Sequence, residues 1–153
     1  MNEVFNLLEC ELDDGEDRPG FLHRRVVIGR RLGAELLGAT VYEVPPGEKL
    51  WPYHWELGCE EFLIVVAGRP TLRTPEGERL LALGDVVHFP EGEPGTHQLR
   101  NDSDGPFRVL IGSTKSPLAV AGYPDSGKVL IWADGRERLV LRDEALDYWD
   151  GEL

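Results

Sequence analysis

A succession of short β-rich runs, separated by turn-forming residues, restricts the fold more than any other feature of this chain. Glycine and proline cluster between the runs, most densely at residues 45–47 and 90–95. The expected strands are residues 38–44, 61–66, 70–74, 79–82, 86–89, 97–101 and 107–111. Short strands spaced by about 8–12 residues, with turn signals between them, are typical of a β-sandwich or β-barrel. We therefore expect an all-β protein.

The strand-rich part occupies only the middle of the chain. A length of 153 residues allows one compact core and leaves little for a second. We expect a single domain with a barrel core at about residues 33–118, preceded by a polar N-terminal arm over 1–30 and followed by a C-terminal extension over 119–153. The arm contains a clear loop at 13–20, and the one expected helix lies near 142–148.

Four polar residues stand out because of their positions on the expected strands. Side chains two residues apart on a strand point to the same face, so His54 and Glu56 share a face. Glu61 opens an apolar strand, and a neighbouring strand that brings His97 opposite would complete a cluster of two imidazoles and two carboxylates. Such a cluster suits a divalent transition metal.

The two segments that carry these residues resemble the paired motifs of the cupin superfamily. The first segment matches at Gly47, His54, Glu61 and Gly68, with Glu56 at the place of the family's second histidine. The second segment matches at Gly84, Pro90, Gly92, His97 and Asn101. The resemblance implies a double-stranded β-helix, the jelly-roll barrel of cupins, with a metal inside held by His54, Glu56, Glu61 and His97. It also implies a homodimer, because cupins are often dimers.

The chemistry of the expected site depends on Glu56, which could bind the metal, hydrogen-bond a neighbour or face a loop. If it does not bind, the set of two histidines and one carboxylate suits Fe(II) and oxygen activation. If it binds, two carboxylates favour Mn(II) or Fe(II), zinc is also compatible, and nickel stays open.

Two functional hypotheses follow from this pattern. The first is a small metal-dependent enzyme, an oxygenase or an isomerase, that acts on a compact organic molecule in the barrel. The alternative is a non-catalytic module that binds or stores a small ligand, since a fold does not determine a function.

Charge and composition exclude several classes of partner. The chain has 28 acidic and 16 basic residues, a net charge of −12, which opposes binding to nucleic acid or to anionic membranes. No apolar run approaches the about 20 residues of a membrane-spanning helix. Two cysteines make no disulfide framework and the first residues are acidic, so we expect a cytoplasmic protein.

Four arginines lie in or beside the expected strands, so an anionic substrate is compatible with the sequence in spite of the negative net charge. The alternative is that they lie on an exposed strand face and pair with the nearby Glu76 and Glu78. These arginines are Arg69, Arg73, Arg79 and Arg100.

Residues 122–129 match the phosphate-binding loop of nucleotide-binding proteins up to the last position. That position needs Ser or Thr to hold magnesium, and Val129 cannot do so. Pro124 also removes a backbone N–H donor. We therefore exclude nucleotide binding and expect a structural turn, and a similar stretch follows the barrel in a subset of small cupins. His23 and His88 are expected to be structural, and Cys59 a plain loop thiol.

Overall fold

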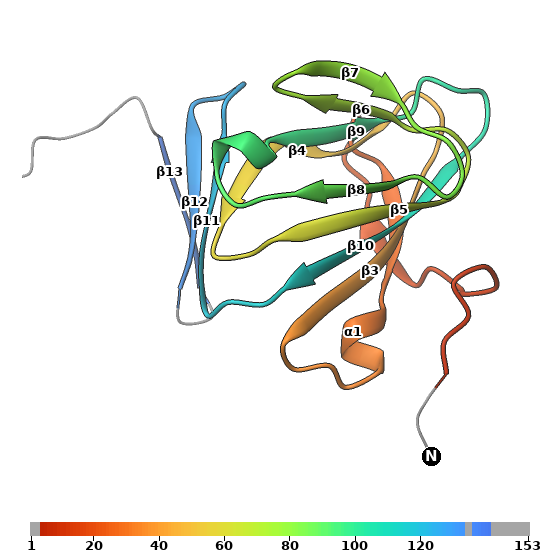
Figure 1. Cartoon of the computed structure of the whole chain (residues 1–153), viewed down its shortest axis with the longest axis horizontal. Helices are drawn as coiled ribbons and strands as arrows, with labels where there is room; N and C mark the ends of the chain where they lie inside the picture. The colour runs from red at the N-terminus through yellow and green to blue at the C-terminus, as the bar shows by residue number, and fades with distance from the viewer. Residues whose placement is uncertain (1–3, 134–135, 142–153) are drawn as a thin grey trace, which may run out of the picture.

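Two antiparallel β-sheets make up the protein, and their inner faces enclose a common core (Figure 1). The computed structural model describes residues 4–133 and 136–141. This architecture confirms the all-β class and the jelly-roll barrel. None of the helices in this part of the chain is long and apolar enough to cross a membrane.

The first sheet has six strands in the order β1-β2-β3-β10-β5-β8. Their bounds are β1 Asp14–Glu16, β2 His23–Val27, β3 Leu37–Val44, β5 Glu61–Ala67, β8 Val86–Phe89 and β10 Phe107–Thr114. β3 and β5 flank β10 on its two sides, although far apart in sequence, so long-range pairing holds this sheet together.

The second sheet has seven strands in the order β13-β12-β11-β4-β9-β6-β7. Their bounds are β4 Lys49–Leu57, β6 Thr71–Thr74, β7 Gly77–Leu80, β9 His97–Arg100, β11 Leu118–Tyr123, β12 Lys128–Ala133 and β13 Arg136–Leu141. β6 and β7 form a hairpin around the expected turn at Thr74–Gly77. Much of the C-terminal extension therefore continues this sheet as a three-stranded meander, while the helix expected near 142–148 lies outside the described residues.

The main core fills the space between the sheets with apolar side chains from alternating strand positions. Leu63, Val65, Val109 and Phe107 come from the first sheet, and all are at most 1% exposed. Leu99 comes from the second sheet and is 2% exposed. Because every second residue of such a strand is buried, the strands could be predicted from the sequence.

The N-terminal arm differs from the sequence-based expectation. The expected loop at 13–20 contains β1, the polar lead-in contains β2, and a short helix, α1, covers Ile28–Arg31. The reason is burial: Val26 and Ile28 pack with Val41 of β3 in a second, smaller core. β2 pairs with β3, a partner distant enough that local sequence pattern does not reveal it.

An irregularity in β4 determines how this strand meets β9. Leu50 pairs with Leu99 and His54 with His97, so β4 carries two extra residues between these pairs. Trp51 lies in this bulge with φ of 59°, a left-handed conformation that is uncommon for a residue with a side chain. The Gln98 side-chain amide donates a 2.8 Å hydrogen bond to the Trp51 carbonyl and so stabilises the bulge.

Candidate metal centre

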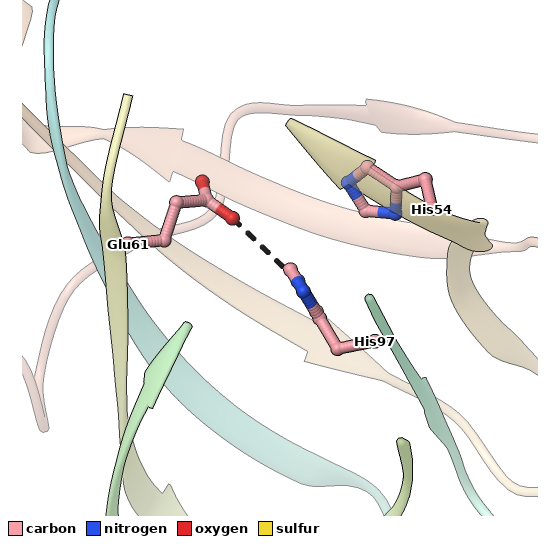
Figure 2. Close-up of side chains that lie close together, drawn as sticks. All are labelled: His54, Glu61 and His97. Atoms are coloured by element: carbon pink, nitrogen blue, oxygen red, sulfur yellow. Dashed lines mark ion pairs between the residues drawn. The ribbon is translucent and has the colours of Figure 1, made fainter. Parts of the chain in front are cut away.

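Three of the four predicted residues come together inside the barrel from three different strands. His54 lies on β4, Glu61 at the start of β5 and His97 at the start of β9, and their side chains point into a common space (Figure 2). One ligand atom from each residue lies within 4.8 Å of the others. His54 and His97 are direct partners across the β4–β9 ladder.

Both imidazoles are oriented by backbone carbonyls. Nδ1 of His54 lies 2.8 Å from the Pro52 carbonyl, and Nδ1 of His97 lies 2.9 Å from the Gly95 carbonyl. Because a carbonyl only accepts, each Nδ1 carries the proton and each Nε2 keeps its lone pair. Outer hydrogen bonds of this kind are typical of metal-binding histidines. Phe89 stacks on His97 with a centroid distance of 3.7 Å and restricts the ring further.

Burial shapes the protonation of Glu61 and His97, whose Oε2 and Nε2 atoms lie 3.5 Å apart (Figure 2). Burial, with a smaller contribution from the charge of Glu56, raises the pKa of Glu61 to about 8. Burial, followed by the neighbouring His54, lowers the pKa of His97 to about 3. Near neutral pH the protein alone therefore holds a protonated carboxyl beside a neutral imidazole.

Glu56 lies beside the three-residue group rather than within it. Its Oε1 is 3.8 Å from Nε2 of His54, and its Oε2 accepts a 2.6 Å hydrogen bond from the Cys59 thiol. Burial and the nearby carboxylates raise the pKa of Cys59 far above its ordinary value, so the thiol keeps its proton and donates. Direct metal binding by Glu56 stays a prediction, and Cys59 is more than the plain loop thiol expected from sequence.

The four residues share a cavity of about 250 Å³. Tyr42, Trp51 and Tyr123 contribute its aromatic wall, and the sequence analysis did not select them. Tyr123 lies at 5.9 Å from His54, ring to ring, in a stacked orientation. The one feature of the sequence that could have drawn attention to Tyr123 is its position within the turn motif at 122–129.

The remaining histidines lie outside the group. His23 is fully buried, with its ring 4.6 Å from that of Trp51, and burial lowers its pKa. His88 is exposed, with its Nε2 3.5 Å from a carboxylate oxygen of Glu60. The burial of His23 agrees with the structural role that we expected, and the same expectation for His88 stays a prediction.

The predicted arginine pairing holds in part. Arg100 binds Glu78 through two hydrogen bonds of 2.6 and 2.8 Å, as expected for an exposed strand face. Arg73 instead binds Asp125, a residue of the turn after β11.

The donor set fits a divalent transition metal. Two imidazoles and one carboxylate are ligands that Mn, Fe, Ni and Zn accept, and three protein ligands leave coordination positions open. Ligand atoms around one such ion, at about 2.1 Å from it, lie about 3–4 Å apart, and the ligand atoms of this group already lie within 4.8 Å of one another.

A double-stranded β-helix with histidine and glutamate ligands inside its barrel is the architecture of a cupin. Residues 40–112 match the family model described as a cupin domain. These residues therefore form a cupin domain.

Two solved structures resemble nearly the whole chain. One is a sugar phosphate isomerase from Silicibacter pomeroyi, with 25% sequence identity, a TM-score of 0.82, and coverage of 97% of this chain and 98% of the other. The second, from Acidithiobacillus ferrooxidans, is provisionally named a sugar phosphate isomerase, with 26% identity, a TM-score of 0.79, and coverage of 84% and 82%.

A third similarity concerns the fold alone. A polyketide cyclase from Streptomyces resistomycificus matches with 21% identity and a TM-score of 0.59, and the alignment covers 74% of this chain and 80% of the other. No curated protein matches the sequence significantly.

Proposed function

We propose that this cupin is a metal-dependent isomerase of small hydroxy-carbonyl compounds, the chemical class to which sugars belong. His54, Glu61 and His97 would hold one divalent metal. When bound, the metal supplies positive charge that polarises a carbonyl or hydroxyl oxygen of the substrate. The names of the two similar structures support the isomerase over the oxygenase.

The observation that carries this proposal is the position of Glu56. Its carboxylate lines the cavity beside His54 yet lies outside the three-residue group, where it is available to a substrate. Isomerisation between an aldehyde and a neighbouring ketone requires a base that removes a proton from one carbon and returns it to the next. The Cys59 thiol holds one Glu56 oxygen, and the other oxygen lies 3.8 Å from Nε2 of His54, which also lines the cavity.

The chemistry balances without any further reactant. Glu56 accepts the proton from the carbon next to the carbonyl, and the electron pair of that C–H bond forms a carbon–carbon double bond. The proton then returns to the former carbonyl carbon while the hydroxyl proton of its neighbour moves to the first oxygen. No net oxidation occurs, so a cavity of about 250 Å³ needs to accept only the substrate.

Proton exchange with solvent tests this function. The metal-loaded protein is incubated in D₂O with a panel of aldoses, ketoses and their phosphates, and deuterium incorporation next to the carbonyl is followed by NMR. We expect exchange with wild type, a loss of at least about a hundredfold with Glu56→Gln at unchanged metal content, and no loss with the control Glu60→Gln. Glu60 is exposed and contacts His88.

Two results would contradict the proposal. One is full exchange activity in Glu56→Gln. The other is a metal-loaded wild type that exchanges no substrate of the panel, which would favour the non-catalytic binding module.

A further inference from the structure

A second, larger hollow adjoins the metal cavity. Its volume is about 470 Å³, and Trp51, Pro52 and Tyr123 line both spaces. We call it the basic groove. Because the two hollows share these walls, the basic groove borders the cavity that contains His54.

The basic groove carries a charge opposite to that of the protein. Its cationic side chains are Arg18, Lys49, Arg73 and Lys128. Among the described residues, two carboxylates, those of Glu16 and Asp125, line the groove together with these cations, in a chain whose net charge is −12. A local excess of positive charge in such an acidic protein attracts small anions to this place.

Three of the four cations have no carboxylate partner within the described residues. Arg73 forms two hydrogen bonds with Asp125, at 2.7 and 2.9 Å, and its guanidinium lies 3.8 Å from the centre of the Tyr53 ring. The Lys49 and Lys128 ammonium groups each lie 5.9 Å from an aromatic ring centre, that of Phe21 and of Tyr123. Ring contacts position these ammonium groups without neutralising them.

The turn motif at 122–129 contributes much of this groove. Tyr123, Asp125, Ser126 and Lys128 all line it. The turn is closed by a 3.1 Å hydrogen bond from the Ser126 backbone N–H to the Tyr123 carbonyl. The motif is thus a structural turn, as expected, whose side chains also build a surface suited to an anion.

We propose that the basic groove binds the phosphate of a phosphorylated substrate whose reacting carbons lie beside Glu56. This deepens the proposed function and rests on it for the role of the metal cavity. Lys49 and Lys128 bind the phosphate oxygens directly. Arg73 supports them, and Asp125 holds Arg73 and opposes the anion by its charge. The substrate class is accordingly sugar phosphates rather than free sugars.

Titration of chelator-treated protein with inorganic phosphate tests the subsite. Without a bound metal, no cation in the metal cavity competes with the basic groove for phosphate. The measurement is isothermal titration at low salt on wild type, Lys49→Gln, Lys128→Gln and Asp125→Asn. The control is Arg79→Gln, which removes one positive charge from β7, outside the groove. One lost charge near a phosphate weakens binding about tenfold.

We expect about tenfold weaker phosphate binding in each lysine variant, tighter binding in Asp125→Asn and no change beyond about twofold in Arg79→Gln. Lysine variants that match Arg79→Gln, or a wild type that binds no phosphate, would overturn the proposal. Thermal melting of each variant confirms that the protein is folded.

A separate measurement distinguishes this proposal from the proposed function. Metal content is determined for the same variants and for His54→Ala. One outcome is that the lysine variants bind phosphate more weakly while neither the wild type nor any variant takes up metal. This outcome would support phosphate binding in the basic groove and contradict the metal-dependent isomerase. The other outcome is that metal content and deuterium exchange are as expected while the lysine substitutions leave phosphate affinity unchanged. This outcome would contradict phosphate binding in the basic groove and support the isomerase.

Discussion

Metal affinity should rise with pH in a way that reports the burial of Glu61. With a pKa of about 8, this carboxyl must lose its proton before it can bind a cation. His97, with a pKa of about 3, is already neutral and contributes no proton above about pH 5. We expect the affinity for Mn(II) to rise about tenfold from pH 6 to pH 7, and less than about twofold from pH 8 to pH 9.

Glu56→Gln tests the cause of this pH dependence. The charge of Glu56 is the second contribution to the raised pKa of Glu61. Removing it should move the pH at which the affinity levels off downward by about one unit. The position of this break is compared rather than the affinity itself, because the substitution also removes negative charge near the cation.

Isothermal titration across this pH range, with Mn(II) as the probe, supplies the affinities. Mn(II) is preferable to zinc because zinc acidifies its bound water, which releases a proton of its own. An affinity independent of pH between about pH 6 and pH 7 would refute the reasoning, since Glu61 would then be ionised before the metal binds.

The raised pKa of Glu61 also predicts how the free energy of unfolding of chelator-treated protein depends on pH. A carboxyl whose pKa is raised in the fold stabilises below its ordinary pKa of 4.5, and this contribution is lost as the pH rises through about 8. His97 opposes this fall, because its unfolded form still binds some proton near 6.5, the ordinary pKa of histidine, but this opposing contribution fades about one pH unit higher. The free energy of unfolding should therefore fall between pH 6.5 and 8, and Glu61→Gln should remove this fall.

Three further results are expected. Wild type purified without chelator should carry about one divalent metal per chain by elemental analysis, and His54→Ala or His97→Ala should lose it, whereas retention would contradict the assignment. Gly68→Ala should destabilise by about 2–4 kcal/mol in urea denaturation, because Gly68 has φ of 73° and an added Cβ would lie 2.7 Å from the Phe107 backbone. Light scattering should give a homodimer, twice 17.1 kDa, and a monomer mass would refute this.

Strand parity in the sequence predicted one part of the site, namely that His54 and Glu56 share a face. The grouping of His54 with Glu61 and His97, which lie on three separate strands, was predicted from the resemblance to the cupin motifs, and the structure brings these residues together. Glu56 shares the parity of His54, but its place relative to the other three depends on the approach of separate strands. The sequence spacing contained no information on that approach.

Features that depend on distant pairing escaped prediction. β2 was missed because its partner β3 lies across the loop that contains Ala34. Tyr123 reaches the cavity only because β11 pairs with β4, where Gly122 stands opposite Trp55. Such contacts are set by tertiary structure, and local composition leaves them undetermined.

The number of residues in the β4 bulge at Trp51 determines which side chains after the bulge face the interior of the barrel. Two extra residues in β4 are an even number, so Leu50 and His54 keep the same face as their partners Leu99 and His97. Deleting one residue of the bulge would turn His54 outward, whereas deleting two would restore its direction. The length of this short stretch is therefore constrained by parity, and changes of chain length here should be tolerated only in pairs.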